Sequence, residues 1–215
     1  MTPPTGEPQQ ERSRRTLEKL LKATTEVLEQ HGLEGATIPR IAERAGVSVG
    51  SVYRRFDDKD ALFKAAFLDL IERAAETNRR NLRPETFAGM SLEVITRALV
   101  RAMVRQFRTH PGLLRALEHF LQHHPDLVFR KRALGLIAEN YGRIGEILLI
   151  CRDRISHADP GRAVRFAIVS AVTIIQARTL ENDTVWEKVA ALDDEELERE
   201  STNLVVAYLT QSICS

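Results

Sequence analysis

The segment Arg44–Phe56, RAGVSVGSVYRRF, decides how the first part of this 215-residue chain folds. Gly46 stands where a helical pattern ends, and glycine adopts the positive φ of a sharp turn at little cost. Ser48 follows two residues later, placed to cap a short helix that runs through Arg55. The segment therefore predicts two short helices joined by a tight turn, which is either a surface for reading DNA or only a bend between helices.

The residues before this segment predict two helices. From Ser13 to His31, leucine and valine recur at three- and four-residue spacing, which indicates an amphipathic helix that stops at Gly32. Thr37 then offers a hydroxyl as N-cap, and Pro39 lies in the first turn, where its missing N–H is not needed. This second helix is expected to end near Ala45.

The rest of the chain is also patterned as helix. Asp57 and Asp58 open a fourth helix with one apolar stripe, and no later run alternates as strands do. No repeat with a period of roughly 20 to 50 residues is present, which argues against a solenoid. The sequence predicts an all-α fold, with breaks between the later helices at Gly89, His110–Gly112, His124–Pro125, Asp159–Gly161 and Glu181–Asp194.

The composition is that of a folded globular protein, with 43% hydrophobic and 28% charged residues. The formal net charge is only +1, so any affinity for nucleic acid must come from local charge. Residues Arg12–Lys59 hold ten Lys and Arg against seven Asp and Glu, a balance of +3. Residues Glu181–Glu200 hold two against nine, a balance of −7. The chain is basic early and acidic late.

No segment is expected to enter a membrane. The most apolar run, Phe166–Ile175, is far shorter than the roughly 20 residues that span a bilayer. Residues 1–15 contain no apolar stretch that would act as a signal peptide. We therefore expect a cytoplasmic protein, in which Cys151 and Cys214 are small buried hydrophobes rather than a disulfide.

The predicted third helix carries the side chains that a groove-entering helix requires. Free N–H groups at a helix N-terminus attract phosphate, small residues allow close approach, and arginine binds phosphate or guanine. Tyr53 adds a hydroxyl donor, and Val52 closes a small core beneath. The same pattern also fits a solvated helix face, so both interpretations stay open for the outward residues Ser48, Val49, Gly50, Ser51, Arg54 and Arg55.

The wider segment Thr37–Phe67, TIPRIAERAGVSVGSVYRRFDDKDALFKAAF, resembles the N-terminal DNA-binding domain of the TetR family of bacterial transcriptional regulators. The match extends back through the first helix to about Arg15. The resemblance implies a three-helix helix-turn-helix domain followed by a C-terminal helical bundle for ligand binding and dimerisation. The expected divisions are a flexible tail over 1–11, the DNA-binding domain over 12–58, and the effector-binding and dimerisation domain over 59–215.

The resemblance also implies roles for individual residues. It assigns phosphate contacts to Thr37, Ser48, Tyr53 and Lys59, and base-proximal positions to Val49, Gly50, Ser51 and Arg54. One departure is YRRF, because many relatives have a second aromatic residue or a histidine after the tyrosine; Arg54 is therefore left to contact either phosphate or guanine. Arg12, Arg14 and Arg15 either add DNA contacts or belong to an ordinary tail. The expected DNA-binding set is Thr37, Arg40, Ser48, Val49, Gly50, Ser51, Tyr53, Arg54 and Lys59.

The late apolar segments indicate self-association. Phe166–Ile175 and Leu204–Leu209 are apolar on nearly every side, and such helices must be covered all round. Two of them near the chain end fit a four-helix interface between two copies, although helices buried within one subunit have the same pattern. The expected interface residues are Phe166, Val169, Ser170, Thr173, Ile174, Leu204, Val205, Tyr208 and Leu209.

The family resemblance implies a small-molecule effector of unknown identity, bound between the fourth helix and those that follow. The expected function is a homodimeric repressor that binds a (pseudo)palindromic double-stranded DNA operator and is released by the effector. The alternative is a regulator of the same fold without a small-molecule ligand, controlled by a protein partner or by its own concentration. The candidate lining residues, which fit plain core equally, are Phe87, Met103, Phe107, Phe120, Phe129, Tyr141 and Phe166.

The sequence does not indicate catalysis, a cofactor or a metal. It lacks a nucleophile elbow, a phosphate loop and zinc-ligand spacing, so no enzyme is expected. His119 and His123 have the spacing of a helical metal site but lack the glutamate or cysteine partners, and histidines before Pro125 are expected to be exposed. A stripe of arginines either attracts an anion or is a solvated face partly neutralised by the acidic late segment; it comprises Arg97, Arg101, Arg105 and Arg108.

Overall fold

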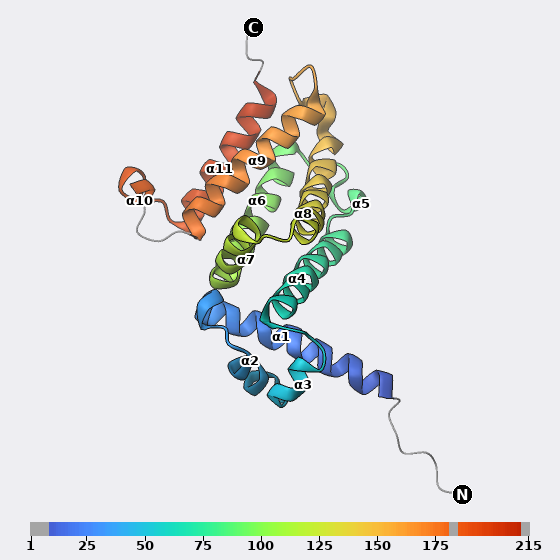
Figure 1. Ribbon diagram of the computed structural model, residues 1–215. Helices are drawn as coiled ribbons and strands as arrows, with labels where there is room; N and C mark the ends of the chain where they lie inside the picture. Colours follow the sequence, from blue (N-terminus) through green and yellow to red (C-terminus); the bar gives the residue numbers. More distant parts are fainter. Residues whose placement is uncertain (1–8, 181–184, 212–215) are drawn as a thin grey trace, which may run out of the picture. The chain divides into compact units, whose positions relative to one another are not determined.

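The computed structural model describes residues 9–180 and 185–211, and every regular element in these ranges is a helix (Figure 1). The all-α prediction is therefore confirmed. Contacts divide the chain into two compact units. The head unit comprises Met1–Glu72 and Gly112–Ala133, and the bundle unit comprises Arg73–Pro111 and Leu134–Ser215.

The head unit begins with α1 (Gln9–Gly35), α2 (Ile38–Ala45) and α3 (Val49–Tyr53). α1 is interrupted at Gly32, where φ is 62°, and one further turn follows. The break was predicted there because only glycine takes a positive φ cheaply. The tail expected over 1–11 lies mostly outside the described residues, and α1 already begins at Gln9.

The head unit continues with the first part of α4 (Lys59–Asn81), then α7 (Pro111–His123) and the start of α8 (Leu127–Leu148). An aromatic cluster joins these helices. The ring of Phe120 on α7 lies 6.1 Å from Phe63 and 5.1 Å from Phe67, both on α4, and 5.7 Å from Phe129 on α8. Edge-on and tilted ring contacts of this kind stabilise a core beyond the area they bury. α7 therefore belongs to the core of the head.

The N-terminus of α7 is fastened to α1. The Glu29 carboxylate accepts hydrogen bonds from the backbone N–H groups of Gly112, at 3.3 Å, and Leu113, at 2.6 Å. These N–H groups have no partner inside the helix, so a carboxylate at this end satisfies them and complements the helix dipole. A Cβ at Gly112 would collide with the Glu29 carbonyl oxygen. Glycine is required here by close backbone approach.

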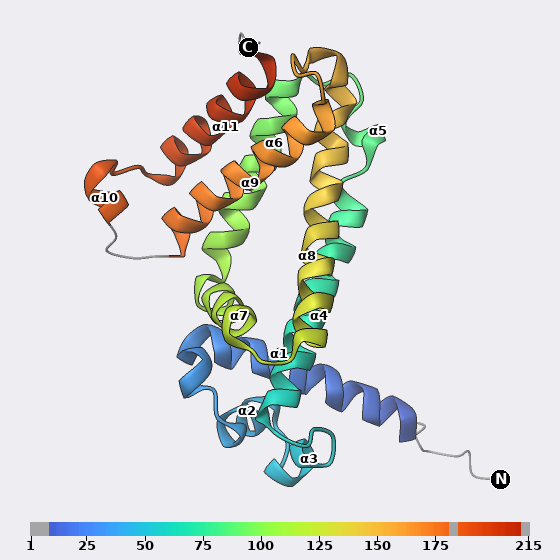
Figure 2. The same cartoon turned by 45° about the horizontal axis from the view of Figure 1, so that its top comes forward.

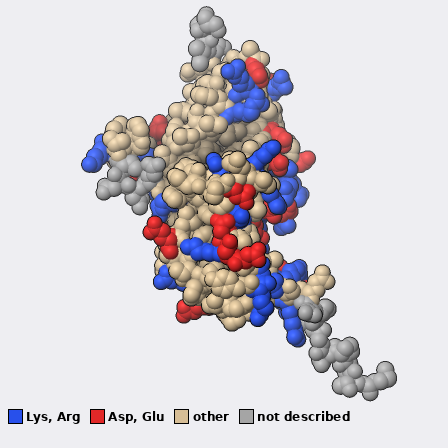
Figure 3. Space-filling view, viewed as in Figure 1, with Lys and Arg blue, Asp and Glu red and all other residues tan. Residues whose placement is uncertain are grey.

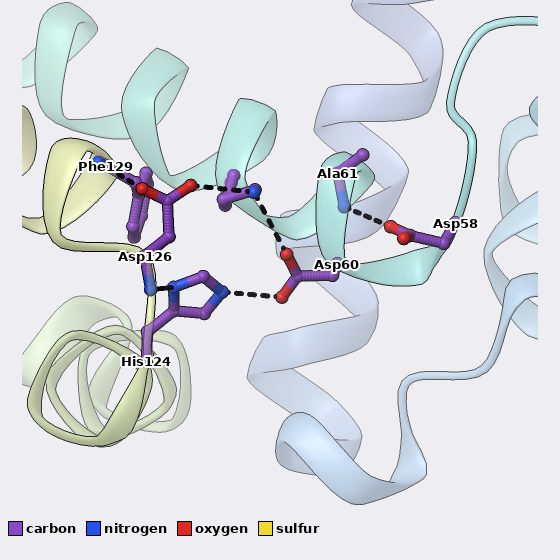
Figure 4. Close-up of polar contacts among 7 residues, drawn as sticks. Asp58, Asp60, Ala61, His124, Asp126 and Phe129 are labelled. Carbon is purple, nitrogen blue, oxygen red and sulfur yellow. Dashed lines mark hydrogen bonds and ion pairs between the residues drawn. The ribbon is translucent and has the colours of Figure 1, made fainter.

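The turn between α7 and α8 is fastened to α4 by a polar network (Figure 4). His124 is buried; its Nε2 lies 2.7 Å from Asp60 Oδ1, and its Nδ1 accepts the Asp126 N–H at 3.1 Å. Because Nδ1 accepts, Nε2 carries the hydrogen and donates it to Asp60. The Lys64 ammonium joins the two carboxylates, 3.2 Å from Asp60 and 3.1 Å from Asp126. The expectation that histidines before Pro125 are exposed is wrong for His124, since these partners hold it inside.

The bundle unit contains α5 (Pro84–Phe87), α6 (Leu92–Thr109), the rest of α8, the 3₁₀ helix η1 (Leu149–Arg154), α9 (Pro160–Thr179), α10 (Val185–Val189) and α11 (Asp194–Thr210). Figure 2 shows α6, α9 and α11 side by side, and each pair is in contact. Their shared core holds Ile95, Ile175 and Leu197, all buried. The contacts thus place the boundary between the two units inside α4. The expected boundary after residue 58 separates a DNA-binding part from an effector-binding part, and it stays a prediction.

On the face drawn in Figure 3, Lys and Arg are interspersed with Asp and Glu. In the arginine stripe of α6, Arg97 pairs with Glu93 at 2.6 Å, and Arg108 pairs with Asp194 of α11 at 2.8 Å. Arg101 lies 3.9 Å from Glu198. Two of these arginines therefore pair with acidic residues of the late segment, which agrees with the expectation of a solvated face that this segment partly neutralises.

Cys151 is a buried free thiol in η1, and Cys214 lies outside the described residues. Burial raises the pKa of the Cys151 thiol, which keeps it protonated and inert at neutral pH. Within the described ranges, no helix is long and apolar enough to cross a membrane.

Candidate nucleic-acid interface

The turn between α2 and α3 has the geometry that the opening segment predicts. Gly46 takes φ 67° and ψ 38°, the left-handed conformation that ends α2. Ser48 then caps α3, its Oγ accepting the Ser51 N–H at 3.2 Å. Beneath the turn, Ile41, Ala42 and Val52 are buried together. Because Val52 faces this core, the opposite side of α3 is left to face outward.

The outward face of α3 is open to solvent. Val49 is 39% exposed and Tyr53 is 54% exposed. A Cβ built on Gly50 would meet only Ser48 Oγ, at 4.0 Å, so nothing in the fold covers this position. The absence of a side chain at Gly50 leaves the backbone of α3 accessible to close approach by a partner.

Arg54 is held at the edge of this face. Its guanidinium donates to Ser51 Oγ at 2.6 Å, and that hydroxyl lies 2.9 Å from Ser48 Oγ. The three side chains therefore form one chain of hydrogen bonds along α3. A guanidinium fixed by a short serine retains further N–H donors for a phosphate or a guanine.

Other predicted DNA-contacting residues surround α3 with differing freedom. Thr37 is the N-cap residue of α2, but its hydroxyl makes no capping bond, contrary to the expectation from sequence. Arg40 donates to the Gly35 carbonyl at 2.6 Å. Lys59 donates to the Leu33 carbonyl at 3.2 Å and lies 5.1 Å from the centre of the Phe63 ring. The Thr37 hydroxyl is therefore exposed and free of a capping bond, whereas the side chains of Arg40 and Lys59 are hydrogen-bonded to the C-terminal end of α1.

Two of the arginines near the start of α1 pair with an acid on the same helix. Arg14 and Arg15 pair with Glu11 at 2.9 and 3.3 Å. Arg55, one of the residues expected to face outward, is only partly exposed and donates to Ser13 Oγ at 3.0 Å. This last contact ties the C-terminal end of the helix-turn-helix to α1.

The side chains expected to line an effector pocket are dispersed through the described structure. Phe120 and Phe129 belong to the aromatic cluster of the head unit. In the bundle unit, Met103 lines a central void of only about 10 Å³, and Phe166 lies on the surface. Phe107 is buried on α6, and Phe87 is partly exposed on α5. Phe120 and Phe129 thus pack within the head unit, Met103 and Phe107 are buried in the bundle unit, and Phe87 and Phe166 are at least partly exposed. An effector-binding role of these residues stays a prediction.

Tyr141 has a different environment. It lines an apolar groove of about 590 Å³ between α8 and α9 within the bundle unit. Most of the residues that line this groove were not predicted from the sequence. The glycines of α8 that open it have no side chain, so a search for polar or aromatic residues does not find them.

The expected dimer residues divide into two groups. Phe166 and Val169 of α9 are 58% and 62% exposed, and Thr173 and Leu204 are also exposed. Ser170, Ile174 and Tyr208 are partly exposed. Val205 and Leu209, however, are buried within the subunit's own core, so the expectation that they face a partner is corrected.

The histidine pair of α7 does not form a metal cluster. The rings of His119 and His123 lie 4.4 Å apart, and His123 Nδ1 is 2.9 Å from the His119 carbonyl oxygen. In the ranges that the structure describes, no three histidine, cysteine or acidic side chains are arranged to hold a metal ion.

Two protein-family models match the chain. The model of the bacterial regulatory proteins of the tetR family matches residues 20–66. The model of the tetracyclin repressor-like C-terminal domain matches residues 91–209, which is more than half of the 215 residues.

Curated relatives are regulators of the same kind. The HTH-type transcriptional regulator BetI of Escherichia coli is 38% identical over 79 residues, which are 36% of this chain and 40% of that protein. BetI of Cronobacter sakazakii is 29% identical over 133 residues, 58% of this chain and 65% of that protein. The chain thus spans less than two thirds of the length of these relatives.

Solved structures share the fold. A TetR transcription regulator from Haloarcula marismortui has a TM-score of 0.63 and 23% identity over 92% of this chain and 97% of that chain. FadR from Bacillus subtilis, in complex with stearoyl-CoA, has a TM-score of 0.62 and 17% identity over 92% and 99%. Because the family models match both the helix-turn-helix and most of the later helices, the chain belongs to the TetR family of transcriptional regulators, which bind DNA through this motif and are not enzymes.

Proposed function

We propose that the protein acts in the cytoplasm as a homodimeric repressor, in which each copy of α3 enters one major-groove half-site of a (pseudo)palindromic operator. The observation that carries the proposal is the uncovered face of α3, with Val49 and Tyr53 exposed beside Gly50. Helix-turn-helix proteins pair because two-fold operators present the same half-site twice. Exposed Phe166 and Val169 on α9 supply apolar surface for that pairing.

The α3 residues divide into two roles in this proposal. Ser48, Thr37 and Tyr53 place hydroxyls, and Lys59 a charge, for phosphate oxygens that fix the register of the helix. Gly50 lets the backbone approach base edges, and Arg54 supplies a donor pair for guanine. The Ser51–Arg54 hydrogen bond supports the role of Arg54, because a guanidinium already held in place loses less side-chain entropy on binding.

We further propose that a small-molecule effector releases the operator. Two neighbours of the same fold were solved with ligands, FadR with stearoyl-CoA and RolR with resorcinol. An effector shifts the dimer away from DNA only if it binds better to the arrangement that does not fit the operator.

The second candidate is a regulator of this fold without a small-molecule ligand. The nearly filled centre of the bundle unit favours it, since the void beside Leu99, Met103 and Ala171 is about 10 Å³. Ligand pockets usually measure about 300–1,000 Å³. Operator binding that no small molecule alters, but that a protein partner or concentration does, would support this candidate.

The decisive experiment is footprinting of the protein on the DNA that flanks its gene, followed by fluorescence anisotropy on the protected site. Tyr53→Phe combined with Arg54→Ala is expected to weaken operator binding by at least about tenfold, because one phosphate and one base contact are lost. The control is Lys131→Ala, which removes an exposed cation of α8. Unchanged affinity of the double variant at moderate salt, with the fold intact, would refute the assigned interface.

A further inference from the structure

The groove between α8 and α9 has the dimensions of a ligand site. Its volume is about 590 Å³, and Leu134, Ile137, Ile168 and Val172 are among the side chains that make its walls. This volume lies in the usual range for small-molecule pockets, about 300–1,000 Å³, which are mostly apolar with a few polar groups. All lining residues belong to the bundle unit.

Two glycines one turn apart on α8 shape the groove. A Cβ on Gly145 would lie 3.4 Å from both Ile168 and Val164, so the helices pack closely at this end. A Cβ on Gly142 would meet nothing within 4 Å, although Gly142 also lines the groove. The missing side chain at Gly142 therefore leaves space that the fold does not fill.

Tyr141 offers one polar contact inside this apolar space. Burial raises the pKa of its phenol, so the hydroxyl is protonated at neutral pH. In the part of the chain that the structure describes, this hydroxyl has no hydrogen-bond partner. The Tyr141 oxygen is not sealed from solvent, so water satisfies it in the free protein, and an oxygen atom of a ligand would take the place of that water.

The two ends of the groove differ in charge. α8 and α9 run in opposite directions around η1, so Glu146 and Arg165 lie at the end near Gly161, whereas Leu134 and Val172 lie at the other end. Arg165 is exposed and makes no ion pair within 4 Å among the described residues, although its charge attracts the nearby Asp159, whose pKa it helps to lower. One end therefore suits a polar head and the other an apolar chain.

We propose that this groove binds an elongated amphiphile of the fatty-acid class, with its hydrocarbon chain along α8 and its carboxylate at the Arg165 end. Glu146 opposes the anion and moderates its affinity. Val169 and Thr173 of the expected dimer face line the groove from α9, whereas Phe166 and Ser170 do not. The sedimentation comparison below therefore separates a small-molecule occupant from a second copy. The proposal rests on the proposed function in one respect only: such a ligand would be the effector.

Binding is tested with dodecanoate, below its micelle concentration, by isothermal titration of the full chain without DNA. One molecule is expected to bind per chain. Gly142→Leu fills the groove and is expected to weaken binding by at least tenfold while leaving the melting temperature equal or higher, since leucine favours helix more than glycine does. Gly135→Leu is the matched control, because Gly135 has open space on the same helix but does not line the groove.

The head-group assignment has its own comparison. Arg165→Gln is expected to weaken dodecanoate binding and Glu146→Gln to strengthen it, and neither should alter the binding of dodecanol. Equal affinity of wild type and Gly142→Leu for dodecanoate would overturn the proposal. A Gly142→Leu protein that sediments as a monomer while the wild type sediments as a dimer would also overturn it, because the groove would then belong to the second copy.

The regulatory consequence is measured separately. Operator binding without dodecanoate tests the proposed function alone, and Gly142→Leu should bind the operator as the wild type does. Dodecanoate at saturation should then lower the operator affinity of the wild type but not of Gly142→Leu. If dodecanoate occupies the groove and operator affinity stays constant, the effector role is refuted and the binding site stands.

Discussion

Gly46 and Gly50 lie four residues apart, but glycine is suited to each position for a different structural reason. Gly46 is needed for its conformation, with φ at 67°, whereas Gly50 lies in α3 with open space where a Cβ would point. Gly50→Ala should leave the melting temperature equal or higher and weaken operator binding by at least about tenfold, because the added methyl stands where the duplex must approach. Thermal melts and anisotropy on the operator measure the two effects.

Gly46→Ala provides the contrast. An L residue in the left-handed region costs roughly 1–2 kcal/mol, so this variant should melt at a lower temperature. Below its melting transition, the folded fraction should still bind the operator. If Gly50→Ala bound as tightly as the wild type, the assignment of α3 to the groove would have to be withdrawn.

The features predicted correctly at single residues are those decided by near neighbours. Gly46 and the Ser48 cap follow from the few residues around them, and both are present. The partners of Arg40 and Lys59 were not predicted. Lys59 donates to the Leu33 carbonyl, 26 residues earlier, and only the folded chain brings these atoms together.

At the scale of elements, the attachment of α7 to α1 depends on Gly112. Gly112→Ala should destabilise the protein by about 1–3 kcal/mol, because the methyl meets the Glu29 backbone, which cannot rotate away as a side chain would. Gly135→Ala on α8 is the control and should be neutral or stabilising, since nothing lies near its Cβ. Chemical denaturation of both variants gives the comparison, and equal stability of Gly112→Ala and wild type would mean that the close approach is not required.

The start of α8 should make stability depend on pH. The pKa of Asp126 is lowered by the hydrogen bond from the Phe129 N–H, 2.9 Å long, and then by Lys64. A lowered pKa adds stability above the unfolded value near 3.8, and that stability is lost as the pH falls through the lower folded value. Asp126→Asn keeps the capping oxygen without the charge, so it should melt below the wild type at pH 7, with the difference disappearing in acid. A difference that persists after Asp126 is fully protonated in the folded protein would assign the effect to something other than this charge.

Element boundaries were largely predictable, whereas the packing partners of the elements were not. Glycine, proline and capping residues mark where helices begin and end, and these signals lie in the chain itself. The membership of α7 in the head depends on contacts such as His124–Asp60, 64 residues apart, and Leu113–Glu29, 84 residues apart. Amphipathic spacing shows that a helix has an apolar face but does not show which helix covers it.

At the scale of the whole molecule, the proposed dimer makes a prediction on α9. Val169→Glu places a charge on an apolar, exposed position and should convert the dimer to a monomer in analytical ultracentrifugation. Operator affinity should fall with it, because a single head contacts only one half-site. Val205→Ala is the control: Val205 is buried within the subunit, so its truncation should lower the melting temperature without changing the association state. A Val169→Glu protein that remains dimeric would move the interface elsewhere.

The sequence predicted the class of the molecule better than the surroundings of its aromatic residues. Helical periodicity and the Thr37–Phe67 resemblance were enough for the all-α fold and the DNA-binding helices. Of the aromatic residues chosen for the effector pocket, Phe120 and Phe129 pack in the head unit and Phe107 is buried in the bundle unit, whereas Phe166 is exposed. Large rings are placed by packing demands as often as by ligands. The space between α8 and α9 arises from absent side chains, which no list of polar or aromatic residues reveals.

The head unit is formed by two separate stretches of the chain, which matters for the design of chimeric regulators. A chimera that joins residues 1–58 to a foreign effector half would leave behind the first turns of α4 and the whole of α7, and with them the rings of Phe63, Phe67 and Phe120. Such a chimera would keep the DNA-binding helices but lack part of the hydrophobic core of the head unit. Glu29 would also lose the hydrogen bond that it accepts from the Leu113 N–H. A chimera that takes residues 112–133 together with residues 1–72 keeps the aromatic core and the Glu29 hydrogen bonds. A DNA-binding unit that is to be exchanged between regulators therefore consists of two separate stretches of chain.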